Sequence, residues 1–354
     1  MSTLESTLAR IGGADSHARK LATEHIKRLA MPDWALGRVL DLACDIAAMT
    51  GEINFSVSRK CLILMAADHG VVVEGVCPQP QSVTAQMVAN FARGGAAINV
   101  LAATAGAALT VVDIGVAADL TRWSASVIDR KIAHGTANMA VTQAMSREEA
   151  IRAVEIGIEI AESLADECDV FAIGEMGIGN TSCSTAVTAA LTGLPISRLV
   201  GRGAGLEESR LAHKAAVIER ALAVNLPNSS DPLDVLAKVG GFELGGLVGV
   251  ALAAADRRKP ILVDGFITAA AALIAVRLSE KVNDFLIFSH VGVEPGLNAI
   301  AAELGKQPLL DLELRLGEGT GAALAMPLLD AAGAVMTRMA SFAAAGVTDE
   351  GIRK

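Results

Sequence analysis

The residue best suited to acid–base chemistry is Glu318, which stands between two glycines in the segment RLGEGTGAALAMP (residues 315–327). The glycines leave this acid without side-chain neighbours in the sequence, and the apolar helical pattern that follows predicts poorly hydrated surroundings. Loss of hydration raises the pKa of a carboxyl group toward the range useful for a general base. An acid that merely interacts with free N–H groups at a helix start is the alternative. The sequence leaves both interpretations open.

Two glycine-rich segments are candidate anion sites. GEMGIGNTS (residues 174–182) follows an expected strand and opens an expected helix, so its backbone N–H groups suit a phosphate. It is neither a GxGxxG nor a Walker A motif, and a plain tight turn is the alternative. GRGAGLEESRLAHK (residues 201–214) ends in Lys214, which either clamps the same phosphate or is a solvated surface lysine.

A third group, Asp68, His69 and Glu74, contains residue types that bind metals, and His290 follows another apolar run in the same way. The spacing of these residues matches no standard metal site. We therefore expect these side chains to form hydrogen bonds within a ligand-binding crevice, with no bound metal and no other cofactor.

The elements that must position these residues follow a repeating pattern. From about residue 60, short runs rich in Val, Ile and Leu alternate with helical patterns, which predicts a Rossmann-like α/β fold with a parallel sheet flanked by helices. Five of the runs end in polar side chains, namely Asp68 with His69, Asp113, Glu175, Asp264, and Ser289 with His290. Ligands bind outside the carboxyl ends of the strands in such sheets. We therefore expect one site lined by all five strand ends; polar residues that simply begin loops are the alternative.

Helical spacing returns at both ends of the chain. Because chain termini often lie close together, we expect a small helical domain built from residues 1–55 and 328–354. Residues 56–327 would then form the large α/β catalytic domain. Between the expected strands, Ser146 and Glu149 have the spacing of a capping box that opens a helix.

Composition narrows the classes of function. The chain has 354 residues, of which 52% are hydrophobic and 19% charged, and its net charge is −9. It contains no basic run, so we expect no nucleic-acid partner. Five cysteines without a CxxC pair indicate reduced thiols in a cytoplasmic protein. The apolar stretches are shorter than the roughly 20 residues of a membrane span, and no signal-peptide pattern is visible, so we expect neither feature.

Taken together, these segments resemble the nicotinate-nucleotide:dimethylbenzimidazole phosphoribosyltransferase family of cobalamin lower-ligand synthesis. The matching segments are, in family order, ADHGV with EGV, SVTAQMVANFARGGAAINVLA, GEMGIGNT, RGAGL with Lys214 downstream, KVGGFELGGL, VDGFITAA, SH…EPG, and RLGEGTGAALAMPLL. They extend from about residue 35 to 330, and several are long and specific. The resemblance implies a Rossmann-like sheet, a small helical domain from both chain ends, and a homodimer.

The resemblance also implies an activity. The family transfers the 5-phosphoribosyl group from nicotinate mononucleotide to 5,6-dimethylbenzimidazole, which gives α-ribazole 5′-phosphate and nicotinate with inversion at C1′. Glu318 falls on the family's catalytic glutamate, the general base, and Glu175 falls on a second acid near the substrates. A non-catalytic nucleotide-binding or regulatory protein on the same fold is an alternative. A metal hydrolase built on Asp68, His69 and His290 is another.

Binding residues follow from the same resemblance. The nucleotide and its phosphate are expected at Gly177, Asn180, Gly203, Lys214, Asp264, Gly265 and Ser289. The base is expected at Gln79, Met87 and Leu316. Four features depart from the family's usual residues. Gly292 stands where a serine is common, and Leu297 replaces a common histidine. QPQ (residues 79–81) stands where an aromatic residue or serine is frequent before the proline, and Met87 replaces a glutamine of some members. These departures concern base selectivity rather than reaction type, and other benzimidazoles, purines and phenols are alternative bases.

Overall fold

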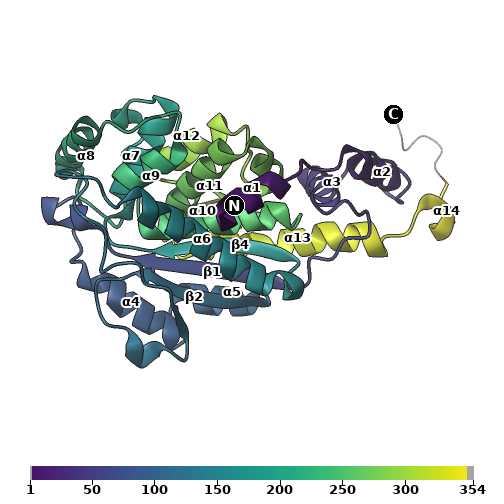
Figure 1. The fold of residues 1–354 in the computed structure, drawn as a ribbon. Helices are drawn as coiled ribbons and strands as arrows, with labels where there is room; N and C mark the ends of the chain where they lie inside the picture. The colour runs from purple at the N-terminus through teal and green to yellow at the C-terminus, as the bar shows by residue number, and fades with distance from the viewer. Residues whose placement is uncertain (1, 349–354) are drawn as a thin grey trace.

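A six-stranded parallel sheet is the centre of residues 2–348, the part of the chain that this computed structural model describes (Figure 1). Its strand order is β3-β2-β1-β4-β5-β6. The strands are β1 (Lys60–Ala67), β2 (Ala107–Gly115), β3 (Val127–Asp129), β4 (Val170–Met176), β5 (Ile261–Val263) and β6 (Leu286–Phe288). β1, β5 and β6 are buried along their whole length, as expected for parallel strands covered on both faces. The predicted α/β class is confirmed.

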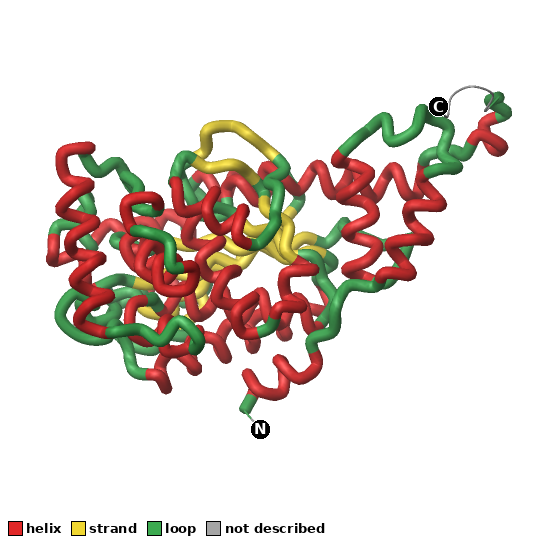
Figure 2. Tube along the Cα trace, turned by 90° about the horizontal axis from the view of Figure 1, so that it is seen from above, coloured by secondary structure: helices red, strands yellow, loops and turns green. Residues whose placement is uncertain are grey.

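Helices cover both faces of this sheet. α10 packs on β1, β2 and β4, and both α6 and α11 lie against α10. Figure 1 shows α4 and α5 on the opposite side of β1 and β2, and α13 contacts α5, β4 and β5. Seen from above, the strands lie in the middle of the molecule with helices around them (Figure 2). The helices of these layers are α4 (Ser82–Ala92), α5 (Ala97–Thr104), α6 (Arg147–Leu164), α10 (Phe242–Asp256), α11 (Phe266–Leu278) and α13 (Thr320–Arg338).

A second, two-stranded parallel sheet and further helices complete the described structure. The two strands are β7 (His290–Gly292) and β8 (Leu310–Leu314). The other α-helices are α1 (Thr3–Arg10), α2 (Ser16–Ile26), α3 (Arg38–Thr50), α7 (Asn180–Thr192), α8 (Leu211–Asn225), α9 (Pro232–Val239), α12 (Pro295–Glu303) and α14 (Phe342–Ala345). The 3-10 helices are η1 (Gly70–Glu74), η2 (Thr121–Trp123), η3 (Ala165–Glu167), η4 (Ile196–Arg198), η5 (Glu208–Arg210) and η6 (Glu280–Phe285). The capping box predicted at Ser146 and Glu149 opens α6.

Segments from both chain ends lie together at one end of the molecule (Figure 1). α2 and α3 pack on each other and on α13, and a backbone bridge joins Leu29 to Ser341 just before α14. α1 instead contacts α6 and α10, so the first helix packs with the large α/β body. Helix α13 connects the two regions, because its start lies beside the sheet and it also contacts α3.

The predicted boundary between the domains, after residue 327, falls inside the continuous helix α13. A small helical domain of residues 1–55 and 328–354 therefore remains a prediction, and its residues 1 and 349–354 lie outside the described range. Among the described helices, α13 is the one long and apolar enough for a membrane span. More than half of it is buried inside the protein, which is the environment of a core helix.

Close backbone contact between helices explains the many small residues. A Cβ atom at Gly157 on α6 would overlap the carbonyl oxygen of Gly246 on α10. A Cβ atom at Gly249 on α10 would likewise overlap the carbonyl oxygen of Val154. Only glycine at these positions allows the two helices to approach so closely, and α10 can then lie flat on the strands that carry the candidate site.

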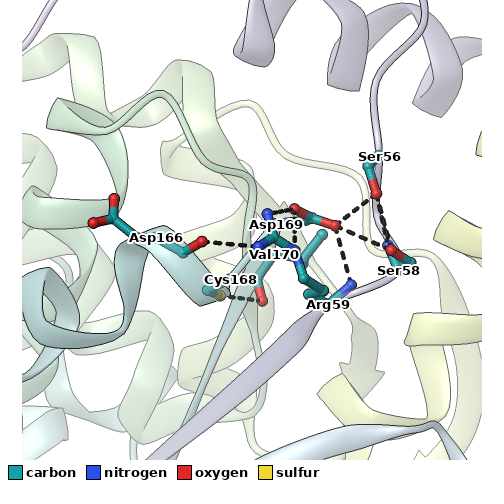
Figure 3. A network of polar contacts seen from close by, with 7 residues as sticks. All are labelled: Ser56, Ser58, Arg59, Asp166, Cys168, Asp169 and Val170. Atoms are coloured by element: carbon teal, nitrogen blue, oxygen red, sulfur yellow. Dashed lines mark hydrogen bonds and ion pairs between the residues drawn. The ribbon is translucent and has the colours of Figure 1, made fainter.

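A buried carboxylate ties the segment before β1 to the start of β4 (Figure 3). Asp169 accepts hydrogen bonds from Ser56 Oγ at 2.6 Å, from the backbone N–H of Arg59 at 3.1 Å and from Arg59 Nε at 3.0 Å. Arg59 also donates to the backbone carbonyl of Asp166 at 2.8 Å. Burial would raise the pKa of Asp169, but the Arg59 and Ser56 hydrogen bonds and the Arg59 charge lower it well below its usual range. This network joins the start of β1 to the start of β4, the strand whose far end carries Glu175.

Candidate active site

A cavity of about 480 Å³ opens beside the carboxyl ends of β4 and β5. The predicted residues that line it are Gln79, Met87, Glu175, Gly177, Asn180, Gly203, Gly265, Leu316 and Glu318. Three predicted residues, Lys214, Asp264 and Ser289, lie outside this lining and are buried behind it. Segments far apart in the sequence thus meet around one space, as sites in open α/β sheets do.

Glu318 is buried in the wall of this cavity, with 6% of its surface exposed. Its backbone is left-handed, with φ at 63°, and its Oε2 atom has no hydrogen-bond partner among the described residues. Burial raises the pKa of Glu318, and the backbone N–H of Ile98 partly opposes this rise. The N-cap residue of α13 is Gly319, so Glu318 does not have the helix-capping role that was the alternative. A buried acid with a free oxygen in a cavity wall has the properties that a general base needs.

Glu175, at the end of β4, is the second acid of the cavity. The side-chain amide of Asn180 donates a hydrogen bond to it. Burial raises the pKa of Glu175 to about 8, and the charges of Asp264 and Glu243 contribute to the rise. Glu175 therefore carries a proton at neutral pH. Gly317 makes room for this side chain, because a Cβ atom there would lie 2.5 Å from Glu175 Oε1.

Asp264 supports the start of α13. Its carboxylate accepts hydrogen bonds from the backbone N–H groups of Gly319 at 3.0 Å, Gly321 at 2.7 Å and Ala322 at 3.0 Å. Burial raises its pKa to about 7, although these three hydrogen bonds oppose the rise. Both carboxylate oxygens of Asp264 accept hydrogen bonds from the backbone, and in this way Asp264 fixes the helix that follows Glu318. The expected position of Asp264 beside the ribose phosphate stays a prediction.

The two glycine loops meet at the cavity, and Lys214 lies behind them. Lys214 is 1% exposed, and its Nζ donates to Thr181 Oγ1 at 2.8 Å and to the Gly201 carbonyl at 3.0 Å. A solvated surface lysine, one of the two interpretations, is therefore wrong. Burial lowers the pKa of Lys214, while the charge of Glu294 opposes this change. The lysine links the segment that opens α7 to the loop that contains Gly203.

Ser289 is placed behind the cavity in a similar way. Its hydroxyl donates to the Asp264 carbonyl at 3.2 Å, and it lies 2.9 Å from Nδ1 of His290. His290 itself lines the cavity. In this structure Ser289 has a supporting role, since its hydroxyl faces the backbone at the end of β5, and the expected contact with the nucleotide stays a prediction.

The polar residues of two of the five strand ends line the cavity, not those of all five as predicted. They are Glu175 at the end of β4 and His290 after β6, whereas after β5 it is Gly265 that lines the cavity and Asp264 is buried behind it. Asp68, after β1, accepts from the backbone N–H of Ala117 at 2.8 Å. Asp113, in β2, pairs with Lys131 at 2.7 Å. Asp68 and Asp113 thus bind nearby loops. For these two acids the alternative is correct, namely that they are polar residues at the start of loops.

The candidate metal ligands His69, Glu74 and Asp68 each bind a different partner within the protein. His69 Nε2 lies 2.8 Å from Glu243 Oε1, and both side chains are fully buried. Burial alone would lower the pKa of His69, but the charge of Glu243 and the contact with Cys183 raise it well above its usual value. Glu74 accepts a hydrogen bond from Asn138 at 2.7 Å. Within residues 2–348, no group of three or more His, Cys, Asp or Glu side chains is arranged to hold a metal ion.

Sequence reasoning assigned no site role to three polar residues of the cavity, Thr181, Glu294 and Arg315, and Glu294 makes the contact that bears on the loops. Its Oε1 atom accepts a hydrogen bond from the backbone N–H of Gly203 at 2.8 Å. In the sequence, Glu294 precedes Pro295, and proline is common at the first position of a helix, so an acid there indicates an ordinary cap. Gly292 and Leu297, two of the departures from the family pattern, line the same cavity.

Comparison with known proteins identifies the type of enzyme to which this chain is similar. A family model described as a phosphoribosyltransferase matches residues 11–347. A relative from Syntrophotalea carbinolica is 52% identical, with 98% of this chain and 99% of the relative covered. A relative from Desulforudis audaxviator is 51% identical, with the same coverage. Both are named nicotinate-nucleotide–dimethylbenzimidazole phosphoribosyltransferase.

Solved structures agree with these relatives. A crystal structure of the nicotinate-nucleotide–dimethylbenzimidazole phosphoribosyltransferase from Thermus thermophilus superposes with a TM-score of 0.89 at 43% identity. The match covers 94% of this chain and 99% of that one. A second structure from the same organism gives a TM-score of 0.90 at 44% identity.

Proposed function

The chain belongs to the nicotinate-nucleotide:dimethylbenzimidazole phosphoribosyltransferase family of cobalamin lower-ligand synthesis, and on that premise we propose a specific reaction for its cavity. The enzyme transfers the 5-phosphoribosyl group from nicotinate mononucleotide to 5,6-dimethylbenzimidazole and yields α-ribazole 5′-phosphate and nicotinate. The observation that carries this proposal is Glu318, a buried carboxyl group with an unpartnered oxygen among the described residues, in the same cavity as two glycine loops.

The chemistry requires one proton acceptor. The bond between C1′ and the pyridinium nitrogen breaks, and its electron pair neutralises the positive charge of that nitrogen, so nicotinate leaves without a general acid. C1′ becomes oxocarbenium-like, as in glycoside hydrolysis. A benzimidazole nitrogen attacks the opposite face, which inverts the configuration from β to α. The proton on the other ring nitrogen then passes to Glu318, whose raised pKa suits this acceptor role.

Glu175 helps by remaining uncharged. With a pKa of about 8, it is protonated when Glu318 acts at neutral pH. Two ionised carboxylates in one cavity would repel each other, and separation of their pKa values avoids this. In this proposal Glu318 takes the proton, and Glu175 shapes the site next to the reacting sugar.

Binding of the nucleotide is assigned to the glycine loops. Backbone N–H groups around Gly177, Asn180 and Gly203 cradle the phosphate, and Lys214 supplies positive charge from behind them. Gly265 lies beside the sugar phosphate.

The base pocket has mainly apolar walls. Met87 and Leu316 pack on the faces of the flat base, and Gln79 lies at the same wall. Leu297 adds apolar surface where a histidine is common in the family, so a hydrophobic base such as 5,6-dimethylbenzimidazole suits this pocket. We further propose a homodimer in the cytoplasm. The five cysteines, all within the described residues, are free thiols, as a reducing compartment requires.

A direct assay tests the reaction and separates it from the non-catalytic alternative. The protein is incubated with nicotinate mononucleotide and 5,6-dimethylbenzimidazole, and the products are separated by chromatography and identified by mass. We expect equal amounts of nicotinate and α-ribazole 5′-phosphate. Nucleotide binding without either product would contradict the proposal and favour a nucleotide-binding protein.

A further inference from the structure

The Gly203 loop binds a carboxylate of the protein itself, the side chain of Glu294. Glu294 Oε1 accepts the Gly203 N–H at 2.8 Å, and Glu294 Oε2 is buried without a hydrogen-bond partner among the described residues. Glu294 is the N-cap residue of α12, yet in the described structure its side chain makes no cap hydrogen bond to that helix. The carboxylate is therefore turned away from its own helix and toward the loop.

The charge of the same carboxylate acts on a buried cation, Lys214. The ammonium group of Lys214 is buried, with Thr181 and the Gly201 carbonyl as its hydrogen-bond partners. Burial lowers the pKa of Lys214, and Glu294 is the leading negative charge that opposes this change. A buried lysine needs a compensating anion. Glu294 supplies that anion at the place where the proposed function puts the substrate phosphate.

From these contacts we infer that Glu294 is an internal competitor of the substrate phosphate. The phosphate displaces the Glu294 carboxylate from the Gly203 N–H and takes over the compensation of Lys214. A nucleoside without a phosphate cannot make this exchange. Glu294 therefore weakens the binding of the phosphate. In the absence of substrate, it holds the Gly203 loop and compensates the charge of Lys214.

The loop geometry shows that the carboxylate can be moved. Gly201 packs directly against Glu294, and a Cβ atom at Gly201 would overlap the two oxygens and the carboxyl carbon of that side chain. These atoms are the far end of a flexible side chain, so a methyl group would push the carboxylate out of the loop instead of breaking the backbone. Gly201 does not have a positive φ angle, unlike Gly203 and Gly205, so alanine is compatible with its backbone.

The test is a binding measurement by calorimetry without any base, so that turnover is not involved. It compares the dissociation constants of nicotinate mononucleotide and nicotinate riboside for the wild type and Glu294→Gln. The amide can still accept the Gly203 hydrogen bond but carries no charge. We expect the variant to bind the mononucleotide about tenfold more tightly, because a like charge is removed from beside the phosphate, and to bind the riboside as the wild type does.

Three further variants make the test specific. Gly201→Ala should also tighten mononucleotide binding, because it displaces the carboxylate mechanically. Glu294→Asp keeps the charge and should stay close to the wild type. Glu303→Gln removes an exposed charge, paired with Arg277, from the same helix and should have no effect. Thermal unfolding of each variant checks that it is folded.

Two results would overturn the inference. Weaker binding of both ligands by Glu294→Gln would show that Glu294 holds the ribose hydroxyls, and unchanged binding of both would show that it does not face the phosphate. This inference rests on the proposed function. Binding of the mononucleotide by the wild type distinguishes a failure of the inference from a failure of the proposed function. If the wild type does not bind the mononucleotide at all, the proposed function fails first and the inference fails with it.

Discussion

Two acids share the cavity, and burial raises the pKa of both, that of Glu175 to about 8. Glu175 accepts one side-chain hydrogen bond, lies near other carboxylates and has a pKa of about 8. Glu318 has a raised pKa whose cause is burial, partly opposed by one backbone N–H. An enzyme that needs one proton acceptor is served best when the neighbouring acid stays neutral. This difference in environment is the physical basis for the separate roles that we propose for the two residues.

The Glu175→Gln variant tests the role of the second acid. An amide resembles the protonated carboxyl group, so we expect this variant to keep most of its turnover below pH 8. The pKa of Glu175 is higher in the folded protein than in the unfolded chain, so the folded state binds more protons between pH 4.5 and 8. The stability of the wild type should therefore fall relative to the variant as pH rises through this window.

Melting temperatures of both proteins at about pH 5, 7 and 9 measure this effect. A constant difference between them across the series would show that Glu175 is ionised throughout, contrary to the proposed division of roles. Turnover at neutral pH provides the second reading: loss of activity as large as that of a general-base variant would make Glu175 a participant in proton transfer.

At the scale of elements, the start of α13 determines where Glu318 points. Three backbone N–H groups at this helix start donate to Asp264, which follows β5. Gly174 of β4 packs against the same turn, because a Cβ atom there would overlap the Glu318 carbonyl oxygen. The proposed catalytic acid is thus held by a capped helix on one side and a strand without a side chain on the other.

The Asp264→Ala variant removes this cap. We expect a loss of roughly 2 kcal/mol in the free energy of unfolding, since several hydrogen bonds to a helix start are lost. We also expect a lower kcat with a smaller change in the KM for the nucleotide, because Glu318 is displaced while the phosphate loops stay intact. Denaturant unfolding and steady-state kinetics measure the two effects. A nucleotide KM that rises strongly while kcat is kept would instead indicate direct contact between Asp264 and the substrate.

The same scale shows what a sequence can and cannot predict here. The five strand runs were located correctly, since buried parallel strands are continuous apolar segments with clear ends. The sequence could not show which of the polar strand ends line the cavity. Asp113 pairs with Lys131, whereas Glu175 lines the cavity, and this difference depends on neighbours from other parts of the chain. The burial of Lys214 could not be predicted for the same reason, because its partners Thr181 and Gly201 come from other elements.

Glu294 was missed for a related reason. An acid before a proline at a helix start is a common cap, and no local signal reveals that its carboxylate is directed to a loop about ninety residues earlier in the chain. Glu318 was the opposite case, because an acid between two glycines is unusual in itself. Family resemblance then supplied its role, which periodicity and spacing had left open.

At the scale of the whole molecule, the Asp169 network joins the helical end of the protein to the sheet. Figure 3 shows Asp169 among Ser56, Ser58 and Arg59, while the side chain of Asp166 points away from them. Asp169→Asn should lower the free energy of unfolding by roughly 1 kcal/mol at neutral pH, a modest value because solvent screens the Arg59 charge. Asp166→Asn is the matched control, because only its backbone carbonyl takes part, and it should leave stability unchanged.

The pH dependence of this effect has a definite sign. The pKa of Asp169 is lowered in the folded protein, so its contribution is complete above the ordinary carboxyl pKa of about 4 and is lost as pH falls toward the lowered value. The difference in melting temperature between wild type and Asp169→Asn should therefore shrink below about pH 4. A difference that grew in acid would show that the carboxylate is not stabilised by Arg59.

Glu318→Gln tests the central claim most directly, through the rate of nicotinate release in the presence of 5,6-dimethylbenzimidazole. The account predicts a kcat lower by about 10²- to 10⁴-fold, with the melting temperature and the dissociation constant of nicotinate mononucleotide close to those of the wild type, since an amide fits the same space but cannot accept the proton. Turnover within a few-fold of the wild type would contradict the account, because another group would then remove the proton from the incoming base.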